Sequence, residues 1–206
     1  MTNDMLKHLA ATSALAALLA APLVAEQTSA QKLYERGAYD ETVQRVNTER
    51  AAGNDDPVAA YLAGQALLKL DRHNDARAEF ARLANNNDQT WHAIGQSAIG
   101  MLDNNLDEAV NEGRKARDMS GESGFAFYQL GLVLIKRGEF DEASQVLDRA
   151  SDLMPEFAYA HYNAGLAHQR AKRFNKMAEH FQVFLQLAPD APERRQVQLA
   201  LNSLRG

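Results

Sequence analysis

The residues best suited to chemistry in this sequence are three histidines near its C-terminal end. His161 and His168 are seven residues apart, which places them on one face of a helix, and His180 belongs to the helix that follows. Imidazole nitrogens are common ligands of transition metals such as Zn²⁺, so a metal site is conceivable here. The pattern offers no carboxylate or cysteine to complete the ligand set. We therefore predict packed or half-exposed histidines, with no metal and no cofactor.

Signatures of catalysis are absent from the sequence. It contains no P-loop, no Gly-rich dinucleotide fingerprint, no Gly-x-Ser-x-Gly and no His-Glu-x-x-His. It has no cysteine, which excludes a thiolate nucleophile and a disulfide. Acidic pairs recur where helices are predicted to begin, and the helix dipole favours negative charge there. These pairs are Asp40-Glu41, Asp107-Glu108 and Asp141-Glu142. We predict no catalytic residues and no enzymatic activity.

The elements that must position these side chains are most evident in residues 124–157. Apolar residues recur at helical spacing up to Leu134, the pattern breaks at Gly138, and it resumes at Phe140 before Pro155 ends it. This pattern predicts two antiparallel helices joined by a short turn. Upstream, we predict that Asp40 caps the second helix of the first hairpin and that Asp56 caps the helix that Pro57 begins.

The hairpin pattern is repeated along the chain. Gly131 and Gly165, Phe140 and Phe174, and Pro155 and Pro189 are each separated by 34 residues. The upstream equivalents of Phe140 are Leu106, His73 and Tyr39, at steps of 34, 33 and 34. A repeat of this length is typical of a stack of helical hairpins, because a single hairpin cannot bury its apolar face alone.

The repeats resemble those of the tetratricopeptide repeat (TPR) family. The copy at residues 124–157 has a suitable residue at all eight signature places: Phe127, Leu130, Gly131, Leu134, Ala143, Leu147, Ala150 and Pro155. The next copy departs from the pattern at His161, Ala164 and Met177, and the copy at 90–123 is degenerate. The resemblance covers roughly residues 26–191. It implies an all-α fold, a right-handed superhelical solenoid of about five TPR hairpins with a C-terminal capping helix.

The resemblance also implies a domain organisation. The TPR domain would span residues 26–206, with repeats at roughly 26–56, 57–89, 90–123, 124–157 and 158–191 and a capping helix at 192–204. Val197, Ala200, Leu201 and Leu204 would lie on the face of that helix that covers the last hairpin. Within hairpins, we predict that the two helices approach closely where small residues face each other, as at Gly131 with Ala143 and Gly64 with Ala76.

Function would then depend on the surface that stacking creates. In TPR proteins the first helices of successive hairpins line a concave groove that receives peptides or partner helices. The groove places are the second, fifth, sixth, ninth and twelfth of each copy. Here they include Tyr61, Gln65, Trp91, Ile94, Phe125, Tyr128, Gln129, Leu132, Ile135, Tyr159, Tyr162, Asn163 and Gln169.

The residues at these places favour one kind of ligand. The carboxylate clamp of chaperone-binding TPR domains is not present, because only Asn163 agrees with it. An aromatic groove favours burial of apolar anchors of a protein or peptide, with tyrosine hydroxyls and amides holding its backbone. The alternative that some of these aromatic side chains pack against the neighbouring hairpin stays open.

Net charge limits the class of partner. The chain carries a formal charge of −5 and its pI is near 5.7, which argues against nucleic acid as a partner because that binding needs a basic face. The partner is expected to be another protein or peptide. We hold two hypotheses: an adaptor or scaffold that binds a protein segment without catalysis, and a structural or self-associating module of an envelope complex.

Residues 1–25 differ in kind from the rest. Lys7 and His8 precede an Ala-rich stretch, residues 9–25, that contains no charged residue and ends just before Glu26. This pattern is typical of a secretory signal, so we predict a periplasmic or secreted protein that does not span the membrane after cleavage. An uncleaved anchor and a helix packed on the first repeat are the alternatives.

Overall fold

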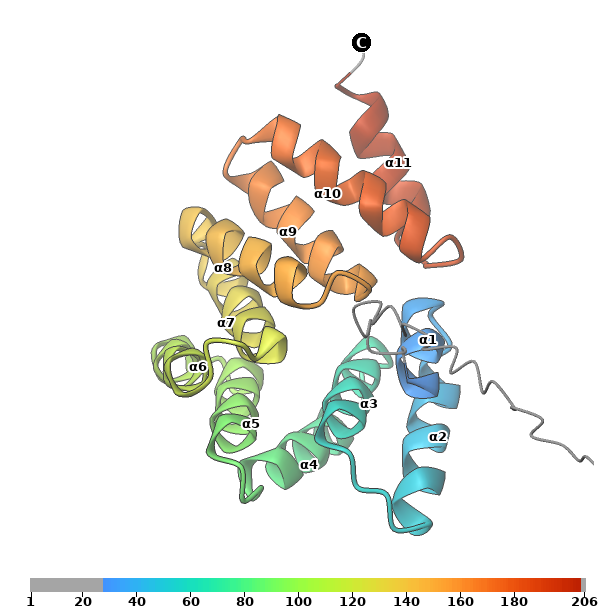
Figure 1. Cartoon of the computed structure of the whole chain (residues 1–206), viewed down its shortest axis with the longest axis vertical. Helices are drawn as coiled ribbons and strands as arrows, with labels where there is room; N and C mark the ends of the chain where they lie inside the picture. The colour runs from blue at the N-terminus through green and yellow to red at the C-terminus, as the bar shows by residue number, and fades with distance from the viewer. Residues whose placement is uncertain (1–27, 205–206) are drawn as a thin grey trace, which may run out of the picture.

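The structure, a computed structural model, describes residues 28–204, and all regular structure in that part of the chain is α-helical (Figure 1). The helices form hairpins of a first and a second helix, followed by one last helix. They are α1 (Ser29–Glu35), α2 (Tyr39–Ala51), α3 (Pro57–Lys69), α4 (His73–Ala84), α5 (Gln89–Leu102), α6 (Leu106–Met119), α7 (Gly124–Arg137), α8 (Phe140–Leu153), α9 (Ala158–Arg170), α10 (Phe174–Leu187) and α11 (Arg194–Asn202).

First and second helices begin in different ways. The predicted cap of α3 is confirmed, since the Asp56 side chain accepts a hydrogen bond from the Val58 N–H and Pro57 is the first helical residue. The predicted cap of α2 is wrong, because α2 begins at Tyr39 and its N-cap is Ala38. Asp40 therefore lies inside the first turn, where its charge faces the positive end of the helix dipole. Second helices all begin at the equivalent residue of each copy: Tyr39, His73, Leu106, Phe140 and Phe174.

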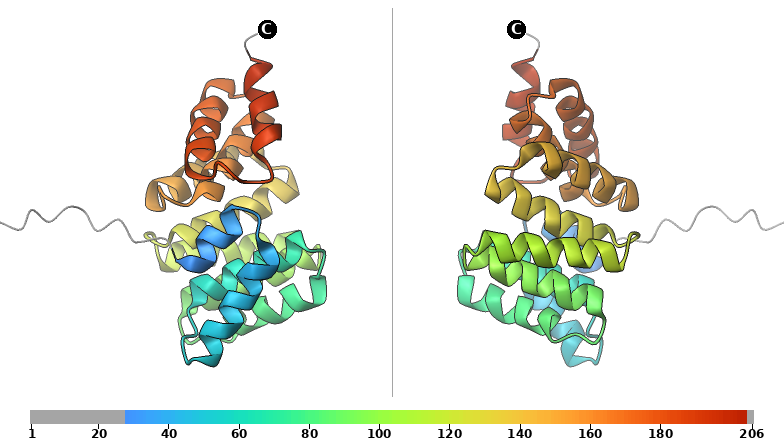
Figure 2. Two further views of the ribbon diagram at one scale, coloured as in Figure 1. Left: turned by 90° about the vertical axis from the view of Figure 1, so that its right-hand side faces the viewer. Right: turned by 90° about the vertical axis from the view of Figure 1, so that its left-hand side faces the viewer.

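The hairpins follow one another in a single stack, and each helix packs against the next one along the chain. First helices also contact first helices of neighbouring hairpins, as α5 contacts α7 and α7 contacts α9. The side views of Figure 2 show the hairpins stacked along one direction, with α10 and α11 at one end. First helices line the inner side of the stack in Figure 1, and second helices such as α4 and α6 lie outside them.

Glycines in the first helices make room for large residues of the second helices. A Cβ atom on Gly131 would lie 2.4 Å from Leu147, and one on Gly165 would lie 2.4 Å from Phe181. The same holds at Gly64, where Phe80 is the close neighbour. The nearest neighbours are thus Leu147 and Phe80, not the predicted Ala143 and Ala76. The large side chain that follows each of these alanines by four residues fills the space above the glycine.

The two ends of the stack contact each other. The Glu35 carboxylate of α1 accepts a hydrogen bond of 2.8 Å from the Ala158 N–H at the start of α9. The hydroxyl groups of Tyr39 and Tyr159 are 3.4 Å apart. Figure 1 shows α1 beside the start of α9, so the first hairpin meets the fifth as well as the second. The inner side of the superhelix is thereby closed around its circumference.

The last helix, α11, covers the final hairpin over part of the predicted length. Val197 is buried, and Ala200 and Leu201 pack against the main hydrophobic core. Leu204, which was expected on the same face, lies beyond the end of α11 and is 43% exposed. Among residues 28–204 no helix combines the length and apolar character needed to cross a membrane. The predicted export signal, residues 1–25, lies outside the described residues.

Candidate functional site

The predicted groove residues lie on the first helices, as expected, but more than half of them are buried. The buried members are Tyr61, Gln65, Ile94, Tyr128, Gln129, Tyr159 and Tyr162. The partly exposed members are Trp91, Phe125, Leu132, Ile135, Asn163 and Gln169. In this conformation the aromatic groove is therefore an internal contact zone. Binding of a partner by these residues stays a prediction.

An aromatic cluster fills the inner side of the stack. The Tyr61 ring of α3 lies 5.5 Å from the ring of Phe125 and 6.3 Å from that of Tyr128, both on α7. Phe157 contacts Tyr128 at 5.2 Å, and Tyr159 contacts Tyr34 of α1 at 4.9 Å. Rings from hairpins that are not neighbours in sequence thus meet face to edge or tilted, the arrangements that aromatic pairs prefer.

The polar ends of this cluster bond to the chain itself. The Tyr61 hydroxyl donates a 2.7 Å hydrogen bond to the Gln129 side-chain oxygen, and the Asn163 amide donates to the Tyr128 hydroxyl at 2.9 Å. The Gln129 amide in turn reaches Ser97 of α5. Burial raises the pKa of Tyr61 and Tyr128 well above the ordinary value of 10.0, so both phenols are neutral. The amides that we expected to hold a partner's backbone hold tyrosines of this chain.

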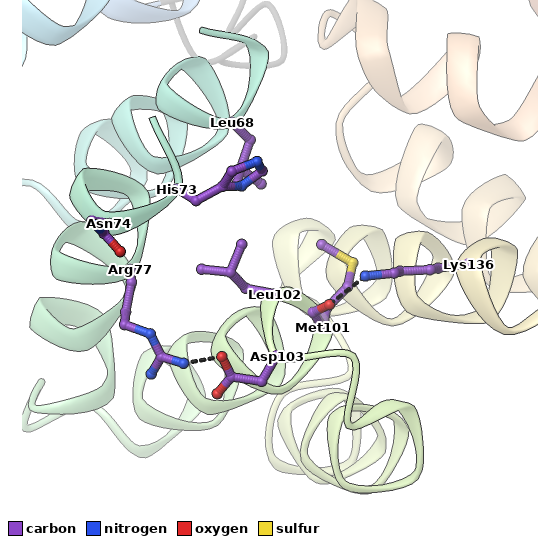
Figure 3. A pocket seen from close by; sticks show the side chains of 8 residues that line it. All are labelled: Leu68, His73, Asn74, Arg77, Met101, Leu102, Asp103 and Lys136. Atoms are coloured by element: carbon purple, nitrogen blue, oxygen red, sulfur yellow. Dashed lines mark hydrogen bonds and ion pairs between the residues drawn. The ribbon is translucent and has the colours of Figure 1, made fainter. Parts of the chain in front are cut away.

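A pocket of about 640 Å³ opens where the last turns of α3, α5 and α7 face one another (Figure 3). We call it the rim pocket. Its lining residues are Leu68, His73, Asn74, Arg77, Met101, Leu102, Asp103 and Lys136. In Figure 3 the Leu102 side chain points into the middle of the pocket, and the polar groups stand around it.

The charged groups of the rim pocket are bonded to the chain itself. Arg77 of α4 forms an ion pair with Asp103, which follows α5. The Lys136 ammonium donates a 2.6 Å hydrogen bond to the backbone carbonyl of Met101. These groups are exposed, so water or a ligand can compete for them. The pocket therefore combines an apolar floor with two cations at its edge.

The sequence contained a signal for this pocket that we did not use. Leu68 and Met101 occupy the twelfth place of their copies, the same place as Ile135 and Gln169 in the predicted groove. The prediction thus identified the correct helix face but favoured aromatic residues. The second-helix residues His73 and Arg77 had no such signal, because that face of the TPR pattern is not assigned to the groove.

The histidine prediction needs a correction. A carboxylate does complete the set: Asp148 of α8 lies within hydrogen-bond distance of both His168 and His180. Burial raises the pKa of Asp148, but the hydrogen bonds from the two histidines outweigh it, so the pKa lies below its ordinary value of 3.8. These three residues are the group in the described part of the chain that could hold a metal ion. The spacing rule missed Asp148 because it belongs to the preceding repeat.

Comparison with known proteins found one matching family model and several similar structures. Residues 131–171 match the family model described as TPR repeat. A TPR protein from Thermus thermophilus has a similar structure, with a TM-score of 0.61 and 20% identity over 84% of this chain and 95% of that chain. The TPR domain of Arabidopsis OM64 matches with a TM-score of 0.51 and 18% identity, over 56% of this chain and 93% of that one.

These likenesses concern the fold, because the identities are low. No curated protein matches the sequence closely enough to count as a relative. The matched residues run from the middle of α7 to just after α9, and they include most of the copy in which the signature residues are complete. The chain therefore contains TPR repeats and folds as a TPR solenoid with a capping helix.

Proposed function

We propose that this protein is an exported TPR scaffold that binds a segment of another protein without catalysis. The rim pocket carries the proposal, because it is open at the ends of the first helices, whereas more than half of the predicted groove residues are buried. Leu68, Met101 and Leu102 provide an apolar floor between two successive first helices, α3 and α5. An apolar side chain inserted there would lose contact with water, which contributes about 1.5–3 kcal/mol.

The edge of the pocket suggests what accompanies this anchor. Lys136 and Arg77 stand on opposite sides of Leu102 in Figure 3, and Asp103 neutralises only one of them. A carboxylate next to the anchor would find the Lys136 ammonium, in exchange for its present bond to the Met101 carbonyl. We therefore propose a ligand segment with one apolar anchor beside an acidic residue.

The test compares variants on and off the pocket. Met101→Ser and Leu102→Ser reduce the apolar floor while both positions stay partly exposed, so the fold should survive. Met119→Ser is the matched control, because Met119 is a 47% exposed methionine at the end of α6 and does not line the pocket. Proteins cross-linked to the wild type in a native envelope extract would be quantified against those cross-linked to each variant.

We expect the same partner to be reduced at least tenfold by both pocket variants and unchanged by the control. Equal capture by all four proteins would refute the pocket as the site. Self-association, the alternative function, predicts that the chain itself is the captured partner. Light scattering then shows a mass that rises with concentration, whereas a monomer at all concentrations removes that alternative.

Export is proposed from residues 1–25 alone. The charged start, the uncharged Ala-rich stretch and the small residues before Glu26 support it. N-terminal sequencing of the protein purified from its native source tests it directly. A mature chain that begins near Glu26 is the expected result, and an intact Met1 would refute cleavage.

A further inference from the structure

Two histidines and one aspartate from three consecutive helices converge on a single point. Asp148 lies on α8, His168 on α9 and His180 on α10. The Nε2 atoms of His168 and His180 lie 2.8 Å and 2.9 Å from the same carboxylate oxygen of Asp148. One ligand atom from each of the three residues lies within 4.8 Å of the others. The cluster therefore joins the second helix of the fourth hairpin to both helices of the fifth.

A third histidine, His161, contacts the cluster and orients His180. His161 Nε2 lies 3.1 Å from the carbonyl oxygen of Pro155, which can only accept, so this nitrogen carries the proton. His161 Nδ1 is then an acceptor, and it lies 3.3 Å from Nδ1 of His180. His180 can then donate through Nδ1 to His161, and the proton that its Nε2 donates to Asp148 would have to leave before Nε2 could bind a metal ion.

The hydrogen bond from His180 to His161 resembles those that support metal-binding histidines in other proteins. Such a histidine usually donates its other ring N–H to an acceptor, which fixes the tautomer and the ring orientation. His180 has that support through His161. His168 is 2% exposed, and its Nδ1 finds no hydrogen-bond partner among the described residues. We therefore expect an affinity below that of a fully supported site.

The cluster is accessible from solvent on one side. A pocket of about 370 Å³ is lined by Asp148, His161 and His180, with Ser151, Asp152, Lys176, Glu179 and Val183 around them. His168 is buried and is not among the lining residues. The one cation in this lining, Lys176, forms an exposed ion pair with Glu179. An ion could enter through the pocket, and a water molecule could occupy a coordination position on that side.

We propose that Asp148, His168 and His180 form a Zn²⁺ site with an open fourth position. Two imidazoles and one carboxylate suit Zn²⁺ better than Mg²⁺ or Ca²⁺, which prefer oxygen ligands. Bonds of about 2.0–2.2 Å in a tetrahedron place ligand atoms about 3.3 Å apart. Each histidine nitrogen would need to move only about 0.5 Å away from the Asp148 oxygen, from its present hydrogen-bonded distance, to admit the ion. Bound Zn²⁺ would tie the fourth hairpin to the fifth.

The test measures metal binding by the tag-free protein after removal of metal with a chelator. Equilibrium dialysis against Zn²⁺ followed by elemental analysis gives the stoichiometry, and calorimetry gives the affinity. We expect about one Zn²⁺ per chain with a dissociation constant in the micromolar range. Saturation at 100 times that constant should raise Tm by about 5–10 °C. Bound Co²⁺ should show the intense visible absorption of a tetrahedral site.

Three variants make the test specific. Asp148→Asn and His180→Gln keep the size of the side chain and should weaken Zn²⁺ binding at least tenfold, with helical circular dichroism unchanged. His73→Gln is the control, because His73 pairs with one aspartate, Asp71, at 2.8 Å but lies outside the cluster. Failure of the wild type to bind Zn²⁺ would leave only a hydrogen-bonded network and refute the site. Equal binding by all variants would also refute it, and preference for Fe²⁺ would refute the choice of metal.

Discussion

Glu35 provides the most quantitative test of how the two ends of the solenoid meet. Glu35 belongs to α1 and is 4% exposed. Its carboxylate accepts hydrogen bonds from the Ala158 N–H and the Gln31 side-chain amide. Burial raises the pKa of this carboxyl group from 4.5 to about 7, although both hydrogen bonds favour the charged form. The negative charge of Glu156 acts in the same direction as burial. Ionisation of Glu35 therefore opposes the contact between the first and fifth hairpins.

The magnitude and sign follow from linkage. The difference between about 7 and 4.5 corresponds to about 3 kcal/mol, at 1.36 kcal/mol for each tenfold change in proton affinity. Because the folded chain binds this proton more tightly than the unfolded chain, stability falls as pH rises between about 4.5 and about 7. Above that window the full cost is present, and below it the cost vanishes.

The perturbation is Glu35→Gln, which keeps an oxygen for the Ala158 N–H and removes the charge. We expect the variant to exceed the wild type in free energy of unfolding by up to about 3 kcal/mol at pH 8, with the difference shrinking towards pH 4.5. Urea unfolding at several pH values, followed by circular dichroism, measures it. Glu41→Gln removes an exposed carboxylate from the same hairpin and is the control. A constant difference between wild type and Glu35→Gln across pH would refute the reasoning.

Three further substitutions test the packing. Tyr128→Ala, which sequence alone would present as a groove variant, should destabilise by about 3–5 kcal/mol because Tyr128 is 1% exposed; an unchanged urea midpoint would mean that the aromatic cluster is open in solution. Gly131→Ala should lower the free energy of unfolding by about 1–3 kcal/mol, because the added methyl group would clash with Leu147. Gly121 has open space around it, so Gly121→Ala should change that free energy by no more than about 0.5 kcal/mol. Equal melting temperatures of these two variants would contradict the close approach at Gly131. Arg50→Ala should cost up to about 3 kcal/mol, because the buried Glu79 carboxylate loses its partner at 2.6 Å and keeps only Arg82 at 3.9 Å; a loss below 0.5 kcal/mol would contradict that pairing.

The sequence was informative wherever the determining contacts are local. A hairpin is specified by apolar spacing and by breaks such as Gly138, and the order of hairpins follows from the 34-residue repeat. The cap at Asp56 was predictable because capping involves residues two positions apart. The same logic failed at Asp40, because α2 begins two residues earlier than an N-cap at Asp40 would require.

The sequence was less informative about the candidate sites. The twelfth place of the repeat correctly indicates an inward face, and Leu68 and Met101 could have been identified from it. The burial of Tyr128 could not be predicted from the sequence, because the same place of the repeat is exposed in an open superhelix and covered in a closed one. Asp148 was missed for a similar reason: its distance to His180 depends on how two hairpins pack, which no spacing within one helix reveals.

Sequence by itself therefore determined the helices, their pairing and their order, since each depends on contacts between residues within one repeat or between adjacent repeats. Tertiary structure alone decided how tightly the superhelix turns. Small rotations between hairpins add up along the stack, and their sum brings Glu35 to Ala158, 123 residues further along the chain. That sum also decides which inward side chains form a core and which line a pocket. Contact between the first and fifth hairpins removes the aromatic cluster from water, whereas the residues of the rim pocket stay at the edge of the superhelix.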